Sequence, residues 1–233
     1  MRAIVVRGGW EGHSPFEATD RFIPFLREHG YEVHASDSLD VYHDADRMAA
    51  ADLIVQCWTM GEITREQRVG LDAAVRAGTG LAGWHGGIAD AFPADMEYKF
   101  MTGGQFIAHP DGFVEYAIEV VSDHPIVAGI ERFTLDTEQY YVHADPSNEV
   151  LATTTFRDHD AYPWIKGVTM PAVWTRHWGE GGCSSARRGT GPRIWTCRRC
   201  ARSSGVACCG RVGSARLGRL ALGPKECQAG TAP

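Results

Sequence analysis

The first half of the chain alternates short apolar runs with helix-start signals. Residues 2–7 form an apolar run typical of a buried strand. Ser14-Pro15-Phe16-Glu17 has the form of a capping box with proline at the first helical position. These signals predict a strand followed by a helix that begins after Ser14 and ends at His29, where Gly30 closes it.

The same alternation continues to residue 84. Residues 31–35 predict a second strand, and residues 52–58 predict a buried one. Thr64-Arg65-Glu66-Gln67 is a second capping box, which predicts a helix to Ala77 before a buried strand at residues 80–84. This order predicts an α/β fold built on an open, mainly parallel, doubly wound sheet.

From Phe113 onward the pattern changes to period-two stretches separated by turns. Such stretches predict antiparallel or edge strands, which we expect to extend the same domain as an antiparallel extension of the sheet. The predicted strands cover residues 113–121, 133–136, 138–143, 150–155 and 171–175.

Open parallel sheets bind ligands at the carboxyl ends of their strands. This rule points to three loops, at residues 8–14, 58–63 and 85–90. The third follows Gly83-Trp84-His85-Gly86-Gly87, in which a buried strand ends in Gly-x-His-x-Gly. Glycines on both sides permit the strained backbone of a nucleophile elbow, so His85 is expected to face the cleft.

Five segments carry distinctive motifs, at residues 6–13, 83–87, 102–110, 123–126 and 137–143. Together they resemble the motifs of the trehalose-utilisation (ThuA-like) family. The resemblance extends over about residues 2–181, and it implies a class I glutamine amidotransferase-like, flavodoxin-like fold and a role in sugar metabolism. The amidotransferases have cysteine at the elbow where this chain has His85, so a glutaminase is not expected.

Histidines and one carboxylate are the candidates for chemistry. We predict His85, His13 and Glu138 as catalytic residues, because imidazole titrates near neutral pH and can act as a general base. The alternatives are a structural histidine at a tight turn for His85 and an exposed loop histidine for His13. A divalent transition metal is the candidate cofactor, although no His-x-x-x-His spacing supports it. Its candidate ligands are His13, His85, His109 and His143.

Aromatic and polar residues at strand ends predict a sugar site. Aromatic faces stack on sugar rings while polar side chains bind the hydroxyl groups. For each tryptophan taken singly, a core position is the better interpretation; it is the presence of three at one edge of the sheet that favours a carbohydrate site. The candidate substrate-binding residues are Trp10, Trp58, Trp84, Gly86, Gly87, Gln105, His109, Tyr140 and His143.

Two kinds of function stay open. The first is an enzyme of trehalose, disaccharide or keto-sugar utilisation, a hydrolase, lyase or isomerase using acid/base or metal-assisted chemistry. The second is a non-catalytic carbohydrate-binding or accessory protein on the same scaffold. A small-molecule sugar is the expected partner, and a homo-oligomer is left open. Without a run of about 18 apolar residues, we expect no membrane span and a cytoplasmic protein.

The composition changes near Gly181. Ten of the 23 Lys and Arg, but only one of the 29 Asp and Glu, lie in residues 182–233. Six of the seven cysteines also lie there. We therefore expect one domain at residues 1–181, which is acidic, and an aberrant, basic, Cys-rich tail at residues 182–233.

The tail has three possible interpretations. A zinc module would rest on Cys197-x-x-Cys200, but the next pair, Cys208-Cys209, lacks the usual gap. A basic arm for nucleic acid would be unusual on an acidic body, so no nucleic-acid partner is expected. Read one frame over, the tail permits an amphipathic helix and a strand. We interpret it as out-of-frame sequence that does not pack on the domain.

Overall fold

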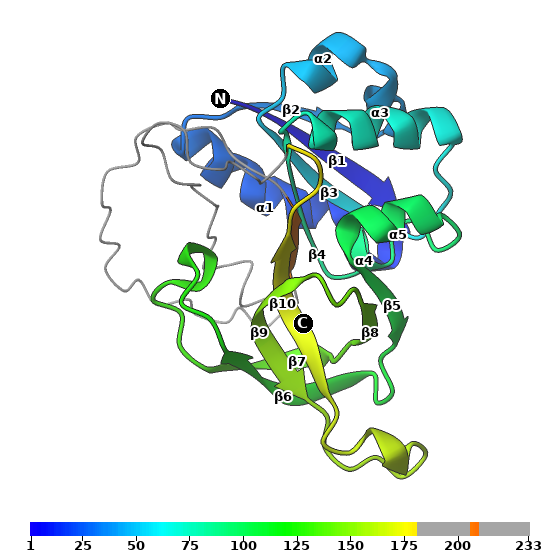
Figure 1. Ribbon diagram of the computed structural model, residues 1–233, viewed down its shortest axis with the longest axis vertical. Coiled ribbons are helices and arrows are strands. Elements are labelled where there is room, and N and C mark those ends of the chain that lie inside the picture. Colours follow the sequence, from blue (N-terminus) through cyan, green and yellow to red (C-terminus); the bar gives the residue numbers. More distant parts are fainter. Residues whose placement is uncertain (181–205, 210–233) are drawn as a thin grey trace, which may run out of the picture.

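The computed structural model describes residues 1–180 and the backbone of Val206–Cys209 (Figure 1). The strands are β1 Arg2–Gly9, β2 Glu32–Ser36, β3 Leu53–Thr59, β4 Gly80–Trp84, β5 Gly104–Ala108, β6 Phe113–Val120, β7 Phe133–Glu138, β8 Tyr141–Ala144, β9 Glu149–Thr155, β10 Thr169–Arg176 and β11 Val206–Cys209. The α-helices are α1 Pro15–Glu28, α2 Ala45–Ala49, α3 Arg65–Arg76, α4 Gly86–Ala89 and α5 Met96–Thr102. Short 3₁₀ helices are η1 Glu11–His13, η2 Leu39–His43, η3 Pro125–Val127 and η4 Pro163–Ile165.

Nine strands form one sheet in the order β2-β1-β3-β4-β11-β10-β9-β6-β7. Strands β2, β1, β3 and β4 are parallel to one another, as predicted. Helices cover both faces of this half: Ala3 and Val5 pack in the cluster under α1, whereas Ile4 and Val6 pack in the cluster under α3. Adjacent residues of one strand thus enter two different cores, which confirms the α/β, doubly wound class.

The second half of the sheet is antiparallel and lies below the helical layer in Figure 1. Here β10 pairs with β9, β9 with β6, and β6 with β7. Strands β5 and β8 form a separate two-stranded ribbon beside α4 and α5. The antiparallel extension predicted from the period-two stretches is therefore present, together with β5, which the sequence pattern did not reveal.

The two predicted capping boxes have different outcomes. Thr64 accepts a hydrogen bond from the backbone N–H of Gln67, and the Gln67 side chain accepts one from Thr64 N. The box at Ser14 is wrong, since Ser14 makes no side-chain cap and has φ of +44°. Its backbone N–H instead donates to Glu11 O at 2.8 Å. The preceding 3₁₀ turn therefore ends where the helix begins and sets the conformation of Ser14.

The strand predicted at residues 138–143 is interrupted. Strand β7 ends at Glu138, and β8 begins at Tyr141 in a different sheet. Gln139 is buried between them and donates from Nε2 to Thr154 Oγ1 at 2.7 Å. This hydrogen bond holds the chain at the point where it leaves the nine-stranded sheet for the two-stranded ribbon. The alternation of side chains between the two faces of β7 therefore does not continue into β8.

Four residues of the tail lie in the sheet. The backbone of Val206–Cys209 pairs antiparallel with β4 and parallel with β10. The expectation that no residue after 181 packs on the domain is wrong for this strand, because ladder hydrogen bonds join backbone groups of any sequence. The rest of the predicted tail, residues 182–205 and 210–233, lies outside the described residues.

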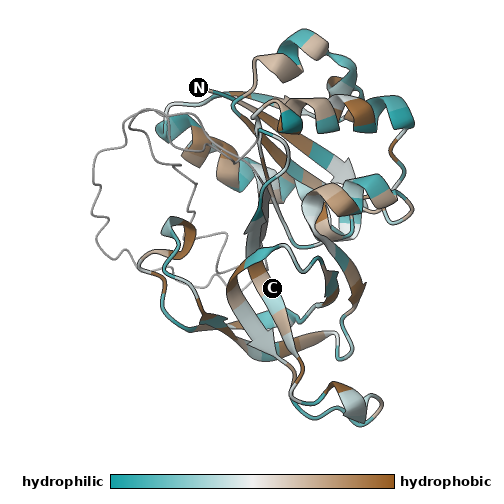
Figure 2. Cartoon of the chain, in the orientation of Figure 1, coloured by the Kyte–Doolittle hydropathy of each residue, from teal (hydrophilic) through white to brown (hydrophobic). Residues whose placement is uncertain are grey.

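Hydrophobic residues gather along the parallel strands, while the helices around them carry a mixture of hydrophilic and hydrophobic positions (Figure 2). Among the described residues, no helix has both the length and the apolar character that a membrane crossing requires.

Candidate functional site

The end of β4 has the strained turn that the glycine pattern predicts. His85 has φ of +51° and ψ of −144°, and α4 starts at the next residue. A residue with a Cβ is disfavoured at positive φ and is retained where its surroundings hold it. The turn places the His85 side chain at the carboxyl end of a parallel strand, as expected for an elbow.

Three predicted catalytic side chains meet at this point. His85 Nε2 lies 3.0 Å from Glu138 Oε2, and His13 Nε2 lies 3.8 Å from the same oxygen. The two imidazole ring centroids are 4.6 Å apart. His109 approaches the other carboxylate oxygen, with Nε2 3.5 Å from Glu138 Oε1. The structure therefore brings three histidines from three separate loops around one carboxylate.

Two neighbours make the approach of His13 feasible. A Cβ added to Gly86 would lie 2.6 Å from His13 Cε1, so only glycine leaves room for the ring. On its other side, His13 Nδ1 lies 2.9 Å from Thr59 Oγ1, at the end of β3. The position of His13 is thus fixed by the ends of β3 and β4.

Both histidines of the pair are held neutral near pH 7. Burial lowers the pKa of His85 to about 3, and the nearby imidazoles of His13 and His109 lower it as well. Burial also lowers the pKa of His13, against the opposing effect of Glu138 and Asp90. A neutral His85 can donate its Nε2 proton to the Glu138 carboxylate.

Tyr140 completes one side of the cluster. Its hydroxyl lies 3.3 Å from His85 Nε2 and is hydrogen-bonded to the Glu138 side chain. Burial and the charges of Glu138 and Asp90 raise the pKa of the phenol, so it remains protonated at neutral pH. Its ring packs against Phe106 at 4.5 Å between centroids. Tyr140 is therefore a fixed hydrogen-bond donor.

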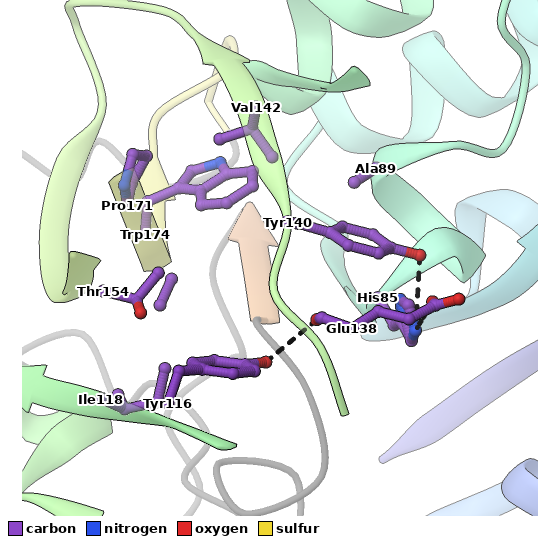
Figure 3. Close-up of a pocket in the computed structure, with 11 residues that line it drawn as sticks. His85, Ala89, Tyr116, Ile118, Glu138, Tyr140, Val142, Thr154, Pro171 and Trp174 are labelled. Atoms are coloured by element: carbon purple, nitrogen blue, oxygen red, sulfur yellow. Dashed lines mark hydrogen bonds and ion pairs between the residues drawn. The ribbon is translucent and has the colours of Figure 1, made fainter. Parts of the chain in front are cut away.

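A cavity lies behind these residues (Figure 3). His85, Glu138 and Tyr140 line one side, and apolar residues including Ile118 and Trp174 line the other. Tyr116 donates from its hydroxyl to the backbone oxygen of Glu138 at 3.1 Å. The cavity volume of about 30 Å³ suits one or two water molecules, so a sugar ring would bind outside it.

The tryptophans are divided between surface and core. Trp10 is 50% exposed, and its ring lies 4.8 Å from that of His13. Trp84 instead packs 4.6 Å from Phe22, against the core cluster under α1. Trp58 packs against the opposite core cluster and fills the space beside Gly8. Of the three predicted stacking residues, only Trp10 is an exposed neighbour of the histidines.

Two predicted residues lie apart from the cluster. His143 is exposed and pairs with Gln105 across the β5–β8 ribbon. Phe106, which contacts Tyr140, pairs with Val142 in the same ribbon. Because neighbouring residues of a strand point to opposite faces, Gln105 and His143 point away from the face that carries Phe106. The register of the β5–β8 ribbon shifts between Phe106 and Ala108, just before His109. After this bulge, His109 Nε2 lies 3.5 Å from Glu138 Oε1.

Sequence reasoning did not select three neighbours of the cluster. They are Thr59 beside His13, Tyr116 under Glu138, and Asp90, whose charge acts on both His13 and Tyr140. Thr59 and Asp90 lie in two of the loops that the strand-end rule selected, so loop membership was the signal available. Burial raises the pKa of Asp90, and the charge of the buried Lys99 opposes this shift.

The model of the family described as "ThuA: Trehalose utilisation" matches residues 2–201. The chain belongs to the ThuA family. Two crystal structures of ThuA-like proteins are similar to this ThuA domain in fold. The protein from Bacteroides uniformis is 18% identical, with a TM-score of 0.58 over 66% of this chain and 68% of that one. The protein from Parabacteroides merdae is 14% identical, with a TM-score of 0.60 over 78% and 76% of the two chains.

No curated protein matches the chain. At identities of 14% and 18%, the two solved structures support the fold of this ThuA protein and not the roles of its site residues. The family match continues beyond residue 181 to residue 201. The predicted change of reading frame and the division of the chain at residue 181 stay predictions.

Proposed function

We propose that this ThuA-family protein binds a disaccharide or keto-sugar and transforms it by proton transfer at the cluster centred on His85. The observation that carries the proposal is the convergence of Glu138 and Tyr140 on the elbow histidine, at 3.0 Å and 3.3 Å from its Nε2. A carboxylate and a phenol on one imidazole provide a proton acceptor and a proton donor at one point.

The chemistry proposed for these residues follows their protonation. Glu138 takes a proton from a substrate carbon or hydroxyl, and neutral His85 holds the carboxylate in position through Nε2. Tyr140, kept protonated by burial, donates a hydrogen bond to the substrate oxygen on which negative charge builds up. A hydrolase, lyase or isomerase could each use this pair.

The surroundings support a sugar as the substrate. Trp10 presents an exposed aromatic face next to His13, and His109, with a side chain 40% exposed, stands on another side of Glu138. A ring that stacks on Trp10 would place its hydroxyl groups against imidazole and carboxylate groups. A glutaminase is not supported, because Cys57, the cysteine among residues 1–180, is buried and burial raises its pKa to about 12.

Turnover of disaccharides and keto-sugars, followed by product analysis, tests the proposal. His85→Ala and Tyr140→Phe should each lower kcat by about 100-fold or more while the circular-dichroism spectrum is retained. Tyr162→Phe is the matched control, since Tyr162 is an exposed tyrosine on the β9–β10 connection. Full turnover by a folded His85→Ala protein would refute the proposal. Sugar binding without turnover would favour the accessory protein.

A further inference from the structure

The three converging side chains have the spacing of a metal site. One ligand atom from each of His13, His85 and Glu138 lies within 4.8 Å of the others. His85 Nε2 and His13 Nε2 lie 3.0 Å and 3.8 Å from Glu138 Oε2. In a tetrahedral site with bonds of about 2.0–2.1 Å, ligand atoms are separated by about 3.3 Å. The two separations from Glu138 Oε2 lie on both sides of that value, and the third, between the two imidazoles, is at most 4.8 Å, so the rings must draw closer together to share one ion.

We propose that His13, His85 and Glu138 bind one divalent transition-metal ion through two imidazole nitrogens and one carboxylate oxygen. This inference deepens the proposed function: the role of the ion rests on that function, whereas the binding of the ion does not. In the metal-bound form His85 carries its ring proton on Nδ1, and its Nε2 binds the ion instead of donating to Glu138. Two nitrogens and one oxygen suit zinc, iron or cobalt, whereas magnesium and calcium prefer oxygen ligands.

The donor atoms agree with this assignment. A metal binds the lone pair of an imidazole nitrogen and an oxygen of a carboxylate. The cluster offers two such nitrogens near one carboxylate oxygen, on side chains that are each less than a fifth exposed.

Outer contacts orient two of the three ligands. His13 Nδ1–H can donate to Thr59 Oγ1 at 2.9 Å, which leaves the Nε2 lone pair directed to the cluster. Tyr140 donates to the Glu138 carboxylate, and Tyr116 donates to the Glu138 backbone oxygen. Metal ligands in proteins are held by such second contacts, and their loss weakens binding.

The elements that carry the ligands are also preorganised. His85 is held at positive φ by the elbow, and Gly86 leaves the space that the His13 ring fills. His109, 3.5 Å from Glu138 Oε1, is exposed enough to approach an ion as a fourth ligand. The remaining coordination positions would be open to water or to a sugar oxygen, as in catalytic metal sites.

Cobalt binding to the full chain, after dialysis against a chelator, tests this inference. We expect one Co²⁺ per chain, with visible d–d absorption bands and no thiolate charge-transfer band. The spectrum separates this site from the cysteines after residue 181, which would give the charge-transfer band. Zinc should displace the cobalt with the same stoichiometry.

Three variants make the test specific. Glu138→Gln keeps the shape of the side chain and should weaken Co²⁺ binding by more than about 100-fold, because it removes a ligand. Thr59→Val removes only the outer contact to His13 and should weaken binding by about 10–100-fold. His43→Ala, which removes an exposed histidine of η2, should leave the affinity unchanged.

The outcomes distinguish this inference from the proposed function. Cobalt that binds only with a thiolate band, or with equal affinity to the folded Glu138→Gln protein, would overturn the metal site. Sugar turnover by metal-free protein would overturn a role for the ion and leave the proposed function intact. Specific Co²⁺ binding without turnover of any sugar would support the site and count against the proposed function.

Discussion

Gly86→Ala is the smallest change that should separate the two histidines. Gly86 starts α4, and its φ is not in the positive region, so alanine is compatible with its backbone. The added Cβ would lie 2.6 Å from His13 Cε1 and 2.8 Å from His13 Nδ1. Thr59 Cγ2, at 3.0 Å, is the next contact, so the perturbation acts on the His13 ring and its Thr59 partner and not on the elbow conformation of His85.

The size of the effect follows from these contacts. Ordinary contact begins at 3.4 Å, so the His13 ring must move by about 0.8 Å. Metal–ligand bonds tolerate about 0.2 Å, so His13 should be lost as a ligand. Overpacking costs about 1–3 kcal/mol, and alanine in a helix regains about 0.5–1 kcal/mol. The unfolding free energy should therefore fall by no more than about 2.5 kcal/mol.

Two measurements test this reasoning. Cobalt titration should show affinity reduced by at least about 10-fold, and urea denaturation should show the small stability change. In a double-mutant cycle, Gly86→Ala should add little to the loss caused by His13→Ala, because both act on the same ligand. Unchanged affinity in Gly86→Ala, or additive losses in the double variant, would refute the proposed contact.

Further predictions concern the helix caps, the core and pH. Thr64→Ala should lower the unfolding free energy by about 1 kcal/mol, because it removes the helix cap. Ser14→Gly should leave the unfolding free energy unchanged, because the Ser14 side chain does not cap a helix. Equal shifts of the urea midpoint in the two variants would contradict this. Gln56→Leu should destabilise by about 1–3 kcal/mol in urea, since Tyr42 loses the buried acceptor at 2.9 Å; an unchanged midpoint would contradict it. In metal-free protein, the folded state keeps His85 neutral while the unfolded chain takes up a proton below about pH 6.5. The unfolding free energy should thus fall by up to about 1.4 kcal/mol per pH unit between about pH 6.5 and pH 3. His85→Asn should reduce this dependence of the unfolding free energy on pH. Tyr140→Phe should lose turnover at every pH up to about 9, because the raised pKa keeps the wild-type phenol protonated.

Local patterns predicted much of the parallel half. The apolar run of residues 2–7 and the buried run of residues 52–58 lie within β1 and near the bounds of β3. The central residues of these strands are buried on both faces, so most of them are hydrophobic and the strands are easy to recognise in the sequence. The capping box at Thr64 could also be predicted from the sequence, because its hydrogen bonds join residues within one turn of helix.

Local patterns were less informative where tertiary contacts set the conformation. Residues 14–17 have the sequence of a capping box, but the Ser14 side chain does not cap α1, and its backbone N–H closes the 3₁₀ turn η1. The stretch around Gln139 looks like one strand but changes sheets, because Gln139 is anchored to β9. Short-range periodicity cannot report such a change of partner, since the anchoring residue is far away in the sequence.

The candidate site likewise has one part that the sequence predicts and another that depends on tertiary contacts. By itself, the sequence determined that His85 stands on an elbow, because Gly83-Trp84-His85-Gly86-Gly87 encodes a sharp turn after a buried strand. Only the tertiary structure decided that Glu138 reaches His85 and His13 while His143 does not. The break after Glu138 and the register of the β5–β8 ribbon determine these orientations, and both depend on strand pairing between distant segments, which no local pattern specifies.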